Sequence, residues 1–192
     1  MSVKLLLMGM SREPGVGISE AAPDCAQTLC VANTFIPLFW LLPFRRVDIH
    51  RQPLTDRVGD YPVLFARREL MLERLDRSLQ PVCELLGPGV APLLQHWMSY
   101  LSERACEVVL LETWDLWRAF ADPQGLLLQV EDQFEALERL VETRHLSDEM
   151  RAALLEPANL LLPGCDSVCL DDISLTGYGW RAHYVLMRHR GR

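Results

Sequence analysis

Lysine is almost absent from this chain. Lys4 is the only one, and the other eighteen basic residues are arginines, against 26 aspartates and glutamates. The formal charge of −7 argues against general nucleic-acid binding, because a protein that binds nucleic acid needs a basic surface. An acidic balance of this size fits a soluble protein, and it also fits a basic protein as the partner.

A long uninterrupted apolar run is also missing. The most hydrophobic stretch, Leu29–Phe44, has sixteen residues, short of the roughly 20 that a helix needs to cross a bilayer. Asn33, Thr34, Pro37 and Pro43 interrupt it. The N-terminal residues lack the longer apolar region and the small-residue cleavage site of a signal peptide. We therefore expect a cytoplasmic protein with no membrane partner.

Common catalytic and ligand motifs are missing as well. The glycines at 9–17 are not followed by the Gly-Lys-Ser/Thr of a phosphate loop, and they do not have the spacing of a dinucleotide fingerprint. No Gly-x-Ser-x-Gly motif and no histidine pair at H-x-x-x-H spacing is present. These absences favour a protein without cofactors and disfavour an enzyme without excluding one.

Compact cysteine pairs are absent, although cysteine itself is not. The closest pairs, Cys25/Cys30 and Cys165/Cys169, have spacings of x4 and x3, whereas strong zinc and redox motifs contain C-x2-C. Buried free thiols are the favoured interpretation, and a four-thiolate zinc site is the alternative. The chain is too long for a small disulfide framework. The remaining cysteines are Cys83 and Cys106.

Hydrophobic residues make up 49% of the 192 residues, enough for one globular domain over residues 1–192. Within the apolar run, Thr34 can cap a helix and Pro37 suits its first turn, while Pro43 ends it. A short, wholly apolar helix should be buried. We therefore expect Phe35, Phe39 and Trp40 in the core, with an exposed docking groove as the alternative.

Apolar residues at helical spacing predict a helical middle. A helix start at Asp60 and Pro62 leads to the "GPG" stop at 87–89, and "DPQG" at 122–125 predicts a turn. Further helices are predicted over 92–105, over 129–144 and after Ser147. The stretch 106–120 fits a strand or a helix, and its spacing favours the helix.

The two ends of the chain have strand-like composition. Val3–Met8 predicts a strand, and Thr176–Gly179 lies between two strand-like runs, which is typical of a hairpin. The sequence therefore predicts an α+β domain, in which a central helical segment packs on a small, mainly antiparallel sheet from the N-terminal strand and the C-terminal hairpin. Asp171 and Asp172 would point to opposite faces of a strand, at an exposed edge or bulge or, alternatively, in a cleft.

The helix predicted over 129–144 carries the clearest surface feature. Four glutamates recur at i, i+4, i+7 and i+11, so they form one ridge roughly a quarter-turn from the apolar stripe. Like charges at i, i+4 destabilise a helix by about 0.2–0.5 kcal/mol per pair, which leaves two interpretations, a solvated acidic face or a surface matched to a basic partner. This acidic ridge consists of Glu131, Glu135, Glu138 and Glu142.

In overall character, and in the tail "VCLDDISLTGYGW" beside the ridge, the chain resembles bacterial toxin-immunity proteins. The resemblance implies a non-catalytic cytoplasmic protein that captures and neutralises a basic partner protein, such as a toxin domain. The partner-binding residues would be the acidic ridge with Asp171 and Asp172. A secretion adaptor or chaperone is an alternative, and so is a small bacterial enzyme with a dispersed Asp/His/Cys site.

We expect the purified protein to hold no stoichiometric metal and to fold without a disulfide, because neither cysteine pair has compact ligand spacing. Elemental analysis and thermal melting with and without a reducing agent check this expectation. One zinc per chain, or a fold that collapses on reduction, would contradict it.

Overall fold

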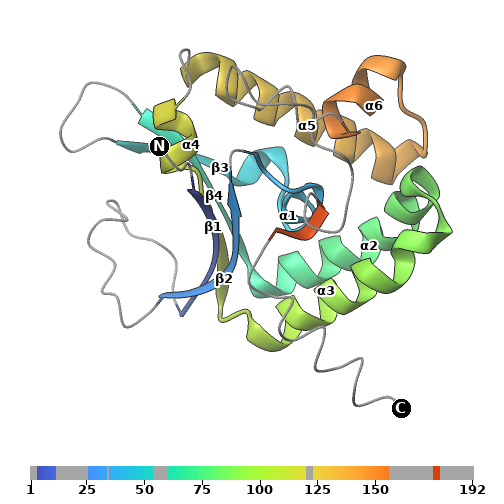
Figure 1. The fold of residues 1–192 in the computed structure, drawn as a ribbon, viewed down its shortest axis with the longest axis horizontal. Helices are drawn as coiled ribbons and strands as arrows, with labels where there is room; N and C mark the ends of the chain where they lie inside the picture. Colours follow the sequence, from blue (N-terminus) through green and yellow to red (C-terminus); the bar gives the residue numbers. More distant parts are fainter. Residues whose placement is uncertain are drawn as a thin grey trace.

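The computed structural model describes residues 4–11, 26–33, 35–53, 60–119, 123–155 and 175–177. Within these residues the chain is an α+β domain, as the sequence predicted, with helices packed on an antiparallel five-stranded sheet (Figure 1). The spatial order of the strands is β2-β1-β5-β4-β3. The strands are β1 (Lys4–Met10), β2 (Ala26–Asn33), β3 (Ile49–Pro53), β4 (Asp60–Arg67) and β5 (Val108–Glu112).

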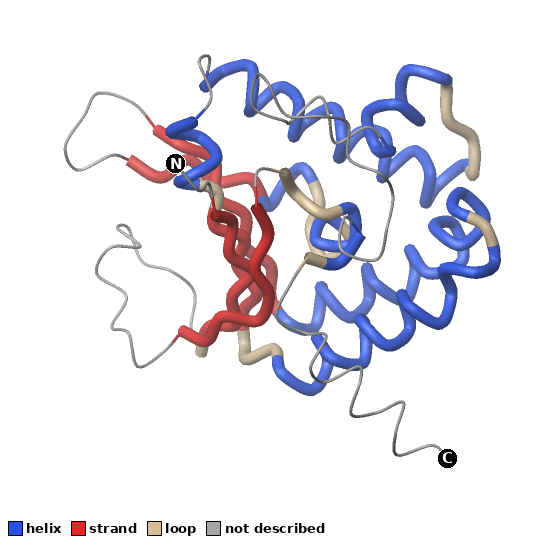
Figure 2. The backbone as a smooth tube through the Cα atoms, viewed as in Figure 1, coloured by secondary structure: helices blue, strands red, loops and turns tan. Residues whose placement is uncertain are grey.

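Most of the helical layer lies on one side of the sheet (Figure 2). The helices are α1 (Leu38–Leu41), α2 (Arg68–Leu86), α3 (Ala91–Arg104), α4 (Trp114–Ala119), α5 (Pro123–Thr143) and α6 (Asp148–Leu155), with short 3-10 turns η3 (Arg46–Asp48) and η4 (Pro88–Val90). In the part of the chain that the structure describes, none of these helices has both the length and the apolar character needed to cross a membrane.

Both faces of the sheet carry buried apolar side chains. Successive side chains of each strand point to opposite faces, so one strand contributes to both clusters. One face packs on the helical layer through residues such as Leu7, Leu64 and Leu111. The other face carries a smaller cluster built around residues such as Val63 and Leu110. The larger core therefore lies between the sheet and α1, α2, α3 and α5.

The predicted helix start at Asp60 and Pro62 is wrong, because residues 60–67 form β4 and α2 begins at Arg68. Aromatic and β-branched residues in "YPVLF" suit a strand with two buried faces. Pro62 is tolerated because it lies beyond Leu64–Arg67, the residues that pair with β5. The Pro62 carbonyl accepts a hydrogen bond from the Thr113 hydroxyl on that same side.

The preference for a helix over 106–120 is wrong for its first half. Val108–Glu112 forms β5, which pairs with both β1 and β4 at the centre of the sheet, and only Trp114–Ala119 is helical. A central strand is buried on both faces, so its sequence shows no polar alternation. The turn predicted at 122–125 is also wrong, since α5 begins at Pro123, where a proline suits a first turn.

The origin of the strands differs from the expectation. Residues 46–53 form η3 and β3, and the described strands of the sheet come from residues 4–112. Of the predicted C-terminal hairpin only Leu175–Gly177 is described, and its first two residues are helical. Asp171 and Asp172 lie outside the described residues.

The remaining predicted helices form. Helix α2 ends before Gly87, and α3 matches its predicted range closely. The Ser147 hydroxyl caps α6 by accepting the Met150 N–H.

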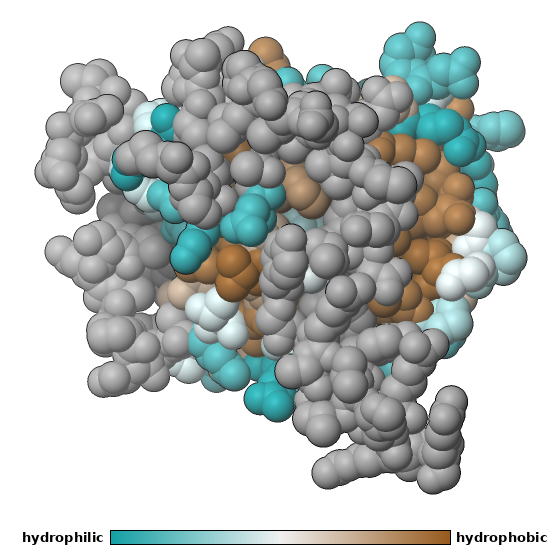
Figure 3. Space-filling model, in the orientation of Figure 1, coloured by the Kyte–Doolittle hydropathy of each residue, from teal (hydrophilic) through white to brown (hydrophobic). Residues whose placement is uncertain are grey.

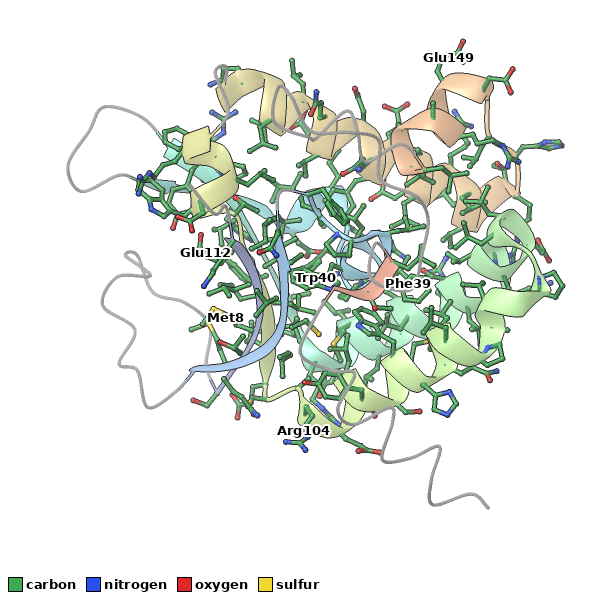
Figure 4. All side chains as sticks on the ribbon, in the orientation of Figure 1. Met8, Phe39, Trp40, Arg104, Glu112 and Glu149 are labelled. Atoms are coloured by element: carbon green, nitrogen blue, oxygen red, sulfur yellow. The ribbon has the colours of Figure 1, made fainter. Side chains whose placement is uncertain are left out.

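The apolar run at 35–44 is core, as predicted, although its helix is shorter than expected. Phe35 has 9% of its surface exposed, and Phe39 and Trp40 have none. Pro37 precedes the first residue of α1 instead of lying in its first turn. The ring of Phe39 lies 5.7 Å, centroid to centroid, from that of Trp97 on α3. Figure 4 shows Phe39 and Trp40 in the interior, between the sheet and the helices.

Phe39→Ala should lower the free energy of unfolding by about 3–5 kcal/mol, because it removes a fully buried ring and leaves a cavity. Val47→Ala is the control: Val47 is 80% exposed, and its truncation should change stability by no more than about 0.5 kcal/mol. Chemical denaturation measures both. Equal effects of the two substitutions would show that Phe39 is not a core residue.

Candidate partner-binding site

Helix α5 presents the acidic ridge much as the sequence predicted. Val130, Phe134 and Leu137 of its apolar stripe are buried, and Val141 is half-buried. The carboxylates on the ridge are not equivalent, however. Glu135 and Glu142 are exposed, whereas Glu131 and Glu138 are partly covered. The cover comes from a segment 85 to 92 residues earlier in the chain.

The covering segment is η3, which sits directly on the ridge. The backbone N–H of Arg46 donates to Glu138 Oε1 at 3.1 Å, and its guanidinium lies 3.4 Å from Glu131 Oε2. Sequence reasoning did not place this cation on the ridge, because the contact joins residues 85 to 92 positions apart. The ridge is therefore half engaged within the chain, while Glu135 and Glu142 remain exposed to solvent.

A buried ion pair fixes the position of η3. Asp48 is 8% exposed and pairs with Arg74 of α2, whose Nη1 lies 2.5 Å from Asp48 Oδ2 and 3.1 Å from the Pro43 carbonyl oxygen. Asp48 also accepts the backbone N–H of Arg45 at 2.7 Å. Such a carboxylate with several donors holds a turn in one geometry.

Arg45 closes the turn from the inside. Its guanidinium donates to the carbonyl oxygens of Leu42 and Phe44, at 3.3 and 2.7 Å. Burial lowers the pKa of Arg45, and the positive charge of Arg74 acts in the same direction. The carbonyl groups of residues 42–44 thus accept hydrogen bonds from the guanidinium groups of Arg45 and Arg74. These contacts fix the backbone just before Arg46.

Each of the two elements in this contact also carries an exposed aliphatic side chain. Val47, next to Arg46, is 80% exposed, and Leu128, three residues before Glu131 on α5, is 59% exposed. Isolated exposed apolar residues are ordinary, but each of these two lies within three positions of one member of the Arg46–Glu131 ion pair. The spacing of Leu128 from Glu131 places it on the same ridge, a signal that the sequence contained. On the face shown in Figure 3, the surface that is not grey has apolar patches with hydrophilic surface at their margins.

A second polar group lies at the C-terminal end of β5, where Figure 4 labels Glu112. Glu112 accepts the backbone N–H of Trp114 at 2.8 Å and the Tyr61 hydroxyl at 3.4 Å, and burial raises its pKa. The rings of Tyr61, Trp114 and Trp117 have centroids 5.1 to 6.3 Å apart. Those are distances between rings in direct contact, so the cluster is packing and not an open cage for a ligand.

The thiols and histidines of the described residues do not converge into a catalytic group. Burial raises the pKa of Cys30 to about 12 and also raises that of Cys83, so neither thiol is activated. His50 is exposed and stacks on Phe65 with centroids 3.8 Å apart. Within the ranges described above, no three His, Cys, Asp or Glu residues are placed to hold a metal ion.

The chain matches no protein-family model, no curated protein and no solved structure. No relative therefore assigns a role to Glu131, Glu135, Glu138 or Glu142. Asp171 and Asp172, predicted as part of the same surface, lie outside the described residues. The contacts between η3 and the ridge are accordingly the basis for a functional proposal.

Asp48→Ala should lower the free energy of unfolding by about 3 kcal/mol, because it leaves the Arg74 charge buried and unpaired. Glu73→Ala is the matched control. It breaks an ion pair with Arg77 in which both side chains are about 60% exposed, and should cost about 1 kcal/mol or less. Denaturation of both variants measures the difference. If Asp48→Ala costs no more than Glu73→Ala, the ion pair does not hold η3.

Proposed function

We propose that this chain is a non-catalytic binding protein that captures and neutralises a basic partner protein, in the manner of a toxin-immunity inhibitor. The observation that carries the proposal is the seating of Arg46 on Glu131 and Glu138. The ridge already accommodates an arginine followed by an exposed aliphatic residue. The free half of the ridge offers carboxylates of the same kind to an arginine of another protein.

The exposed groups divide the work of binding between them. Glu135 and Glu142 attract a basic surface over distances longer than a contact, which raises the association rate and discriminates between partners. Exposed ion pairs alone contribute little affinity, about 0–1 kcal/mol each. Apolar anchors must supply the rest, and Val47 and Leu128 are exposed aliphatic side chains on the two elements that form the contact.

Two other classes of protein are supported in part by the same observations. A secretion adaptor or chaperone would use the same acidic and aliphatic surface, and it differs in releasing its partner folded and active. An enzyme with a dispersed Asp/His/Cys site is less well supported, because burial suppresses ionisation of the Cys30 and Cys83 thiols. A cytoplasmic location belongs to the proposal in the same way.

Glu135→Lys with Glu142→Lys should slow association with the partner on the order of tenfold at low salt, and by less at high salt. Exposed charges are screened over about 10 Å at 0.1 M salt, so the salt dependence identifies the effect as electrostatic. Glu138 is left intact because its carboxylate holds the Arg46 N–H. The measurement is the association rate constant at two ionic strengths, by surface-based or stopped-flow kinetics. The partner is the basic protein identified by co-purification and then produced as recombinant protein.

The matched control is Glu69→Lys with Asp76→Lys, which makes the same change in net charge at two exposed positions of α2. Both double variants should unfold at the same denaturant concentration as each other. Equal slowing by the two would attribute the effect to net charge alone. Unchanged kinetics in the α5 variant would leave the ridge as an ordinary solvated face.

A further inference from the structure

Glu112 lies at the junction where β5 ends and α4 begins, and its carboxylate joins elements on either side. Its Oε1 accepts the backbone N–H of Trp114 in α4 at 2.8 Å, and its Oε2 accepts the hydroxyl of Tyr61 in β4 at 3.4 Å. Its partner on β1 is Leu6, which is apolar. The Glu112 side chain is half-buried beside the rings of Tyr61 and Trp114, which contact each other. One carboxylate therefore holds the start of α4 against the sheet.

The charged groups around this carboxylate do not neutralise it. Asp115, in the first turn of α4, adds a second negative charge. Arg118 of the same helix lies over the Trp114 ring, 5.7 Å from its centroid, and Lys4 of β1 is exposed. Neither cation forms an ion pair with Glu112 in the described part of the chain. Burial, the largest cause, and the charge of Asp115 raise the pKa of Glu112, while its hydrogen bonds oppose that rise.

We propose that Glu112 is a proton-binding site that strengthens the junction between β5 and α4 as the pH falls from neutral to mildly acidic values. The site is separate from the acidic ridge and does not depend on the function proposed for that ridge. Proton binding removes the charge that burial opposes, and a neutral carboxyl group keeps an oxygen that accepts the Trp114 N–H. Helix α4 stays in place in both forms, and the free energy that holds it there is what changes.

The direction of the pH effect follows from the environment of the carboxyl group. In the unfolded chain Glu112 titrates at its ordinary pKa of 4.5, and in the folded chain its pKa lies above that value. The folded state therefore binds the proton more tightly, so the stability that this group contributes is fully present below pH 4.5 and is lost as the pH rises through the folded pKa. At neutral pH the ionised Glu112 makes the fold less stable than an uncharged side chain of the same shape would.

The test titrates the Glu112 carboxyl group by ¹³C NMR in the full-length protein, with Glu112→Gln to assign its signal. The titration midpoint should lie above pH 4.5, and the backbone N–H of Trp114 should shift with the same midpoint because it donates to this carboxylate. Tyr61→Phe should raise the midpoint further, since it removes a donor that favours the ionised form, and Asp115→Asn should lower it by removing a repulsion. These opposite shifts separate the local charges from a general effect of substitution.

Denaturation at several pH values gives the second measurement. Glu112→Gln should unfold at a higher denaturant concentration than the unsubstituted protein at neutral pH, and this gain should shrink as the pH falls towards 4.5. Glu107→Gln is the matched control, because it removes an exposed carboxylate just before the other end of β5 and should change the unfolding midpoint little at any of these pH values.

A Glu112 titration midpoint at or below pH 4.5 would overturn the proposal. So would a folded Glu112→Gln protein that is no more stable at neutral pH than Glu107→Gln. If Glu112→Gln does not fold, the titration of the unsubstituted protein decides, with the Glu112 signal assigned from its shifts in Tyr61→Phe and Asp115→Asn.

Discussion

An indole N–H that is buried without an acceptor lowers stability, and the hydrogen bond that satisfies Trp40 connects distant parts of this fold. Trp40 is fully buried, so an unpaired Nε1–H would cost on the order of 1–3 kcal/mol. Its acceptor is a carbonyl 136 residues later. The neighbouring Phe39 ring contacts Trp97 on α3. Helix α1 is thus the point at which the sheet, the helical layer and residues 175–177 meet (Figures 1 and 4).

The candidate site depends on the same short helix. After α1 the chain passes through Pro43, and within a few residues it goes from the buried core to the exposed residues Arg46 and Val47. Arg74 binds the carbonyl of Pro43 and the carboxylate of Asp48, so the exit is fixed to α2. Arg46 and Val47 follow from that geometry, and they meet α5 where its glutamates lie. The surface proposed for a partner is consequently held in place by the packing of α1 and α2, and not by an independently moving loop.

Sequence reasoning found what local periodicity encodes. The acidic ridge and most helices follow from spacing, and the core role of Phe35, Phe39 and Trp40 follows from the apolar run that contains them. It failed where both faces of a strand are buried, as in β4 and β5, because apolar residues then repeat without a polar alternation. It also could not place Arg46 on Glu131, since that contact joins positions 85 residues apart. Leu128 was readable from its position on the ridge, whereas Val47 required the turn geometry.

The strand order leaves β2 and β3 as the outer strands, and the chain protects both from pairing with foreign strands. Tyr100 on α3 donates to the carbonyl of Leu29 at 2.7 Å, at a bulge in β2, and the Val31 carbonyl lies against Gly177. The other edge, β3, is five residues long and ends in Pro53, which has no N–H to offer. The described outer strands therefore offer fewer free backbone groups to another chain, which is the feature that limits edge-to-edge pairing of sheets.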